Sequence, residues 1–191
     1  KKVITVGSYT TKTSWTDILG NSWSTTGETS GNVSTFSSSG PTRDLRNKPE
    51  ILAPGCVIGS TITKNTVTSP FYTLPDGEHM IMQGTSMSAP HVTGIVALML
   101  QRNNNLDYDT VKNALISTGS RGGNWEKKNG YGKVNALAAF EYIPGTPLPT
   151  NLAVTEVHSY PNPARGNYVT FVYKVNSDCN ANINFYNLTG E

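Results

Sequence analysis

The chain has 191 residues, of which 15% are charged, and its formal net charge is +2 at pH 7. So small a charge excludes the basic surface that nucleic-acid binding requires, and only Lys127 and Lys128, in an expected loop, form a basic pair. The low charge and the abundant Ser, Thr, Asn and Gly are typical of a loop-rich extracellular protein with one or two domains.

Short apolar segments alternate with polar loops in the first part of the chain. This alternation predicts strands at residues 3–6, 36–40, 50–53 and 56–62. Trp15 and Trp23 are the large apolar groups of the polar stretch 9–34. We interpret them as a satellite core in preference to a site where a ligand stacks.

A helix with a hydroxyl at its start is predicted in the middle of the chain. A segment at 80–82 leads into Gly84 and Thr85, which predict a tight turn with Ser86 at its crest. The apolar run 92–100 that follows has a length that only a helix would fill. We expect Pro90 in the first turn of this helix and most sides of the helix to be buried.

The position of Ser86 favours nucleophilic chemistry. The first N–H groups of a helix have no intrahelical acceptor, and the helix dipole adds positive potential there. An oxyanion beside Ser86 would therefore be stabilised by the backbone N–H of Ser86. The alternative is a serine that only caps the helix, which is a common role.

Two more helices are predicted before the composition changes. One ends near residue 118 and is capped by Asp107 or Asp109, and the other runs from about residue 135 through residue 140. Strands with intervening helices predict a layered α/β domain.

A second unit is predicted after a proline-rich linker. The linker covers residues 144–153, and strands at 168–175 and 181–188 predict a β-rich segment over 154–191. Two strands are too few for a stable sandwich, so we expect this segment to be only the start of one.

Residues 84–94, Gly-Thr-Ser-Met-Ser-Ala-Pro-His-Val-Thr-Gly, resemble the serine signature of the subtilisin-like proteases. Residues 3–8, 36–41, 48–55 and 130–136 resemble other motifs of that family, in the family's order. The likeness covers residues 1–143 and implies a three-layer parallel sheet with flanking helices. It also implies a serine endopeptidase that hydrolyses peptide bonds through an acyl-enzyme at Ser86.

The Asp-Ser/Thr-Gly and His-Gly-Thr-His motifs of the other two triad members do not occur in the sequence, and the oxyanion asparagine of the family would precede Val3. The resemblance thus predicts the C-terminal half of a catalytic domain, with the natural N-terminus upstream and the isolated chain inactive. The expected partners are the missing half and a protein or peptide substrate. The alternatives are a non-catalytic subtilase-like scaffold and a secreted surface-binding protein.

The resemblance also assigns roles around the serine. Gly84 is assigned to substrate binding. Thr85 either places its hydroxyl near the oxyanion or only forms the turn. Met87 is either a core residue or the side chain under the serine that peroxide oxidises.

The histidines are weak candidates for the general base. His91 follows Ser86 by five positions, which rotates it about 140° away on a helix, so we expect a buried, hydrogen-bonded histidine. His79 shares a predicted surface loop with Asp76, and His158 has no acidic residue nearby in sequence.

No cofactor is expected to be required. The family often binds calcium, and Glu50, Asp44, Asp76 and Asn65 are candidate ligands, but no calcium loop with regular oxygen spacing is visible.

The remaining signals concern the location of the protein. Cys56 and Cys179 are interpreted as separate free thiols, and no apolar run reaches the roughly 20 residues of a membrane span. Residues 160–163 and 187–191 resemble the opening of the C-terminal β-sandwich that the type IX secretion system reads as a sorting signal. This resemblance predicts a secreted or cell-surface bacterial protein with secretion machinery as a partner.

Overall fold

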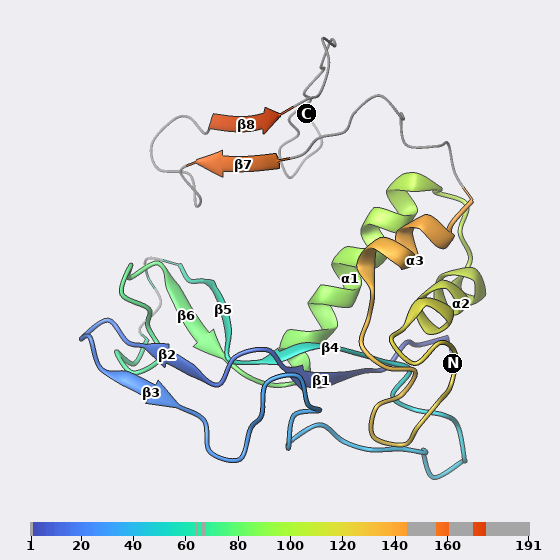
Figure 1. Cartoon of the computed structure of the whole chain (residues 1–191), viewed down its shortest axis with the longest axis horizontal. Helices are drawn as coiled ribbons and strands as arrows, with labels where there is room; N and C mark the ends of the chain where they lie inside the picture. Colours follow the sequence, from blue (N-terminus) through green and yellow to red (C-terminus); the bar gives the residue numbers. More distant parts are fainter. Residues whose placement is uncertain (1, 64, 66–67, 145–155, 161–169, 175–191) are drawn as a thin grey trace. The chain divides into compact units, whose positions relative to one another are not determined.

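The computed structural model describes residues 2–63, 65 and 68–144, and the backbone of two strands further on. The chain divides into two compact units, residues 1–145 and 146–191 (Figure 1). In the second unit, β7 (Glu156–Tyr160) pairs antiparallel with β8 (Thr170–Lys174), which lies within the strand predicted at 168–175. The strand predicted at 181–188 and residues 145–153 of the predicted linker lie outside the described residues.

Two parallel strands form the centre of the first unit. β1 (Val6–Thr10) pairs with β4 (Ile51–Cys56), with Val6 opposite Ile51. Residues 131–134 lie along the other edge of β4, where Leu52 N–H donates to Gly132 O (2.8 Å) and Val134 N–H donates to Leu52 O (2.8 Å). Nearly every residue of β4 is buried, as expected of a parallel strand covered on both faces. The α/β class predicted from the sequence is confirmed.

The strand predicted at 3–6 is shifted in the structure. β1 begins only at Val6, the last residue of the predicted strand, and continues through Gly7 to Thr10. A Cβ at Gly7 would lie 2.6 Å from Leu52 Cδ2, so the close packing against β4 favours glycine there.

The strand predicted at 36–40 is wrong. Ser37 N–H donates to Ser34 O (2.9 Å), which forms a turn, and Ser37 Oγ accepts a hydrogen bond from Ser8 N–H (3.0 Å). The serine hydroxyl therefore supplies to β1 a hydrogen bond that a strand would supply from its backbone.

Three helices lie on one side of the β1–β4 pair: α1 (Thr85–Arg102), α2 (Tyr108–Thr118) and α3 (Ala136–Tyr142) (Figure 1). Asp107 accepts a hydrogen bond from Thr110 N–H (2.8 Å), which decides between the two predicted caps of α2. Asn135 caps α3 in the same way. The helices and strands share one hydrophobic core: Ile51, Ala53, Val92, Met99, Val111, Ala114, Leu115, Ala139 and Ile143.

The prediction that α1 is buried on most sides is wrong. Ser88, Val92 and Met99 are its buried residues, whereas Leu98 is 51% exposed. The described strands and α3 pack against one face of α1 and leave apolar side chains on the rest of its surface exposed. Pro90 is the sixth residue of α1, not a first-turn residue, because the helix begins at Thr85.

Two antiparallel hairpins complete the first unit. β2 (Ser14–Thr16) pairs with β3 (Ser22–Ser24), and β5 (Ile58–Thr61) pairs with β6 (His79–Met82). The strand predicted over 56–62 is interrupted because Val57 has a positive φ of 54°, which separates β4 from β5.

An aromatic cluster joins the two hairpins. Trp15 Nε1 donates to Phe71 O (2.9 Å), and the rings of Trp15 and Trp23 meet Phe71 edge-on at centroid distances of 5.2 and 4.6 Å. Asp17, which is buried, accepts a hydrogen bond from Trp23 Nε1 (2.8 Å) and thereby orients this indole. The two tryptophans thus form a satellite cluster.

A buried ion pair connects β4 to the chain before β1. Glu50 is buried, forms an ion pair with Lys48 and accepts a hydrogen bond from Thr5 N–H (2.8 Å). The Lys48 ammonium also donates to Val3 O (2.7 Å). Lys112 lies farther from the carboxylate, with its Nζ 3.9 Å from Glu50 Oε1.

We predict that Lys48→Met in the full-length protein lowers the free energy of unfolding by up to about 3 kcal/mol, because it leaves the buried carboxylate with only the more distant Lys112 as a charged partner. Urea unfolding measures the change. The control is Lys2→Met, which removes an exposed ion pair with Asp109 and should have little effect. Equal effects of the two substitutions would contradict the prediction.

We also predict an acid transition of the β2–β3 hairpin. Burial raises the pKa of Asp17, but hydrogen bonds from Trp23, Asn21 and Leu19 together lower it by more. The net shift of this pKa is therefore downward. A depressed pKa stabilises the fold above the unfolded value of about 3.9, and this contribution is lost as the pH falls through the folded pKa. Tryptophan fluorescence should therefore change below about pH 4.

In the variant Asp17→Asn this acid step should be absent, whereas Asp109→Asn, which removes an exposed carboxylate on α2, should retain it. An unchanged step in Asp17→Asn would refute the assignment.

Candidate active site

The turn before α1 depends on a close approach of two backbone segments. Gly84 is the N-cap of α1 and has a φ of 145°, which favours glycine. Its N–H donates to Gly55 O (2.8 Å) near the end of β4. A Cβ at Gly55 would lie 2.2 Å from Ser88 Oγ and 2.8 Å from Gly84 O, so a larger residue would push the turn away from the strand.

This turn places Ser86 at an exposed position beside a cavity. Ser86 is the second residue of α1 and is exposed. It lines a cavity of about 370 Å³ together with Ile58, Gly59, Ser60, Met87, Pro90 and His91. The hydroxyl is therefore open to a molecule bound between the β5–β6 hairpin and α1.

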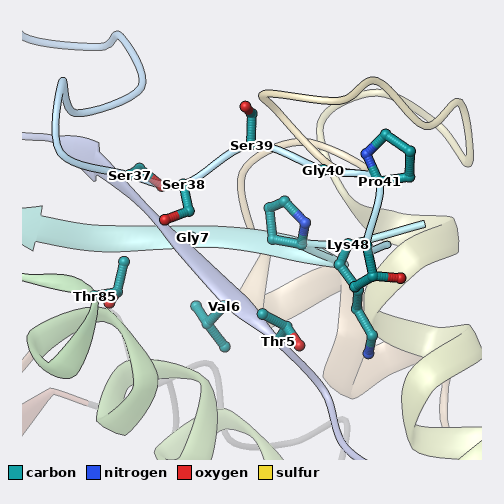
Figure 2. A pocket seen from close by; sticks show the side chains of 12 residues that line it. Thr5, Val6, Gly7, Ser37, Ser38, Ser39, Gly40, Pro41, Lys48 and Thr85 are labelled. Atoms are coloured by element: carbon teal, nitrogen blue, oxygen red, sulfur yellow. The ribbon is translucent and has the colours of Figure 1, made fainter. Parts of the chain in front are cut away.

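A second cavity lies on the Thr85 side of the turn. Figure 2 shows Thr85 at the start of α1, and Val6, Gly7 and the loop from Ser37 to Pro41 also line this cavity of about 320 Å³. The predicted site residues Thr85 and Ser86 are thus adjacent in sequence but border different cavities.

The N-terminus of α1 retains its capacity to bind an anion. Met87 N–H donates to Gly84 O (3.0 Å), whereas no described carbonyl accepts a hydrogen bond from Ser86 N–H. The first turn of α1 has no acidic residue, and no side chain caps it. The positive potential there is therefore not neutralised by a carboxylate of the helix itself.

Met87 lies next to the turn. A Cβ built on Gly84 would lie 3.8 Å from Met87 Sδ, and Met87 is half-buried. The side chain thus packs close to the backbone that precedes Ser86.

The prediction that His91 is buried is wrong, although it does form a hydrogen bond. His91 is exposed because only one face of α1 is covered, and its Nδ1 donates to Met87 O (2.7 Å). It borders the same cavity as Ser86, yet among the described residues no side chain forms a hydrogen bond with the Ser86 hydroxyl.

His79 is engaged elsewhere. It begins β6, and its Nδ1 lies 2.7 Å from Asp76 Oδ2. Hydrogen bonds from the backbone N–H of Glu78 and from His79 lower the pKa of Asp76, against a smaller effect of burial. The side chain of His158 lies outside the described residues.

The candidate calcium ligands do not converge. The Glu50 carboxylate is occupied by Lys48 and Thr5 N–H, Asp44 by Arg46 and Thr42, and Asp76 by His79. Among the residues that the structure describes, no group of three or more His, Cys, Asp or Glu could hold a metal ion. These residues do not fit a calcium site.

Cys56 is a buried free thiol whose Sγ–H donates to Gln83 Oε1 (3.7 Å), and burial raises its pKa. A raised thiol pKa disfavours the reactive thiolate, so Cys56 does not compete with Ser86 as a nucleophile. Cys179 lies outside the described residues.

Sequence reasoning missed two parts of the site. Gly55, which supports the turn, lies between the strands predicted at 50–53 and 56–62 and was given no role in the site. Residues 58–60 were predicted only as part of a strand, although they border the Ser86 cavity. The Ala-Pro-Gly sequence at 53–55 was the available signal, because a glycine after a buried strand marks a close backbone approach.

A comparison with protein families decides the relationship. The family model described as Peptidase S8, subtilase family, matches residues 1–133. The chain belongs to the subtilase family. This subtilase chain is 38% identical over 115 residues to the serine protease AprX of Bacillus subtilis, a match that covers 59% of the chain and 26% of AprX.

Other relatives agree. Fervidolysin of Fervidobacterium pennivorans is 38% identical over 94 residues, 48% of the subtilase chain and 13% of fervidolysin. Its crystal structure, described as that of a keratinolytic enzyme related to subtilisin, superposes on 79% of the chain and 20% of fervidolysin with a TM-score of 0.52 and 29% identity. The CO(2)-response secreted protease of Arabidopsis thaliana is 31% identical over 94 residues, 48% of the chain and 12% of that protease.

The chain thus spans about a quarter or less of the length of these relatives. No helix in the described part of the chain has the length and apolar character needed to cross a membrane.

Proposed function

We propose that this chain supplies the nucleophile of a subtilisin-type serine endopeptidase and that the nucleophile is Ser86. One observation carries the proposal. Ser86 is exposed, and its backbone N–H donates no hydrogen bond to a carbonyl of the described residues. The hydroxyl and the N–H of Ser86 lie at the N-terminus of an 18-residue helix, beside a cavity. The relatives include a serine protease, AprX, which supports the proposal of the same reaction for this chain.

The mechanism is acyl transfer. Ser86 Oγ attacks the peptide carbonyl carbon while a histidine outside these 191 residues takes the hydroxyl proton. The C–N bond then breaks, the histidine returns the proton to the leaving amine, and an ester remains on Ser86. Water activated by the same histidine hydrolyses the ester and restores the hydroxyl.

The oxyanion of each tetrahedral intermediate is stabilised by Ser86 N–H, the positive end of α1 and an asparagine outside the chain. We assign Thr85 to a supporting role beside the oxyanion, because it is the residue directly before Ser86 and is exposed. We assign Gly84 to substrate binding through the second lone pair of its carbonyl oxygen, because its N–H already donates to Gly55 O. Met87 supports the turn. No step involves a metal.

We further propose that the protein is secreted and cleaves protein or peptide substrates outside the cell. The low charge of the chain and the secreted protease among the relatives support this location. Residues 154–191 would act as a sorting signal for secretion machinery, with the β7–β8 hairpin as its first element.

We expect Ser86→Ala to abolish labelling of the full-length protein by a fluorophosphonate probe, because the probe phosphonylates an activated serine hydroxyl. Circular dichroism should be unchanged, since Ser86 is exposed. Labelling that survives the substitution would show that the nucleophile is another residue, and absence of labelling in the wild type would favour a non-catalytic scaffold.

A second prediction tests whether His91 is the general base of the reaction. His91→Gln should keep at least about a third of the labelling rate, because glutamine can still donate to Met87 O and the base lies elsewhere; loss of a general base costs about 10²-fold or more. A folded His91→Gln protein that labels no faster than Ser86→Ala would make His91 the base and contradict the mechanism.

A further inference from the structure

A third cavity, of about 420 Å³, lies between the two hairpins of the first unit. We call it the aromatic pocket. Its walls come from Trp15 on β2, from Phe71 and Tyr72 before β6, and from the segment that ends in Met82 and Gln83. Figure 1 shows the two hairpins side by side, with β6 leading toward the start of α1, and the Trp15 to Phe71 hydrogen bond joins them.

The aromatic pocket is apolar and its walls are held in place. Val57 and Ile81, which are buried, line it together with the Trp15 ring, whose Nε1 donates to Phe71 O. Tyr72 and Met82 line it too and are 46% and 48% exposed, so the pocket opens to solvent. No charged side chain is among the described residues that line it.

The chemistry of the lining selects the occupant. Aromatic rings favour edge-on contact with another ring, and thioether sulfurs such as those of Met80 and Met82 also favour contact with rings. The volume lies within the range of about 300–1,000 Å³ that is typical of ligand pockets. A charged group would lose its hydration there without gaining a partner.

The aromatic pocket lies within reach of the scissile bond. Gln83 lines it and precedes Ser86 by three residues. Consecutive Cα atoms are about 3.8 Å apart, so the Cα atoms of Gln83 and Ser86 are separated by at most about 11 Å. An extended peptide advances about 3.3 Å per residue, so a residue three or four positions from the cleaved bond covers this distance.

We propose that the aromatic pocket is a substrate subsite that binds a bulky apolar side chain, with preference for an aromatic one, within about four residues of the cleaved bond. This inference rests on the proposed endopeptidase function.

The test uses the full-length protein and a series of fluorogenic peptides in which one Phe is placed at successive positions of an alanine-rich sequence. At one position kcat/KM should exceed that of the all-alanine peptide by at least about tenfold, because a phenylalanine side chain leaves water. Met82→Lys should reduce this ratio to about twofold or less and favour a peptide with Asp at that position.

The matched control is Leu19→Lys, which places the same charge on a residue that is 71% exposed and does not line the aromatic pocket. In Leu19→Lys, the ratio of kcat/KM for the Phe peptide to kcat/KM for the all-alanine peptide should equal the ratio in the wild type. Fluorophosphonate labelling of both variants should persist, which separates a defect of the subsite from a defect of Ser86.

Binding of the same peptides to the Ser86→Ala protein, measured by fluorescence anisotropy, needs no turnover and tests the subsite even if Ser86 is not the nucleophile. The Phe peptide should bind about tenfold more tightly than its alanine counterpart. Equal binding at every position, or equal effects of Met82→Lys and Leu19→Lys, would overturn the subsite.

Discussion

The hydrogen bond from Gly84 N–H to Gly55 O is the constraint on which the candidate site depends. It joins the start of α1 to the carboxyl end of β4, the edge of a parallel strand pair where α/β proteins place their ligands. Glycine is favoured at both ends of the bond for different reasons: a Cβ on Gly55 would collide with Ser88 and with Gly84 O, whereas Gly84 has a φ of 145°. The exposed hydroxyl, the free N–H and the dipole of α1 are therefore brought together by one backbone contact.

The charges of the first unit differ between its buried ion pair and the start of α1. The buried carboxylate of Glu50 is paired with Lys48, two residues earlier in the chain. The start of α1, in contrast, has no carboxylate in its first turn. A transient negative charge beside Ser86 would thus meet uncompensated N–H dipoles in a region with no competing anion from the helix itself.

The aromatic side chains of the β2–β3 hairpin pack against Phe71 and are held by hydrogen bonds. Hydrogen bonds orient both indoles, Trp15 through Phe71 O and Trp23 through Asp17, so the rings are rigid before any ligand arrives. A rigid apolar wall loses little entropy on binding, which favours a defined side-chain preference. β6 ends at Met82, two residues before the turn that carries Ser86, so the β5–β6 hairpin leads directly into that turn.

The sequence by itself determined the serine turn, the helix behind it, the buried strand at 50–53 and the family, because each depends on local propensity and on a long uninterrupted motif. It did not determine which segments pair or which faces are covered. Ser37 hydrogen-bonds to β1 through its side chain and so leaves no strand at 36–40, Val57 breaks a continuous apolar run, and α1 exposes apolar residues together with His91. The approach of Gly55 to Gly84 and the meeting of Trp15 with Phe71 likewise join residues far apart in the chain. Only the tertiary structure decided these features, because they arise from contacts between distant segments that no local pattern encodes.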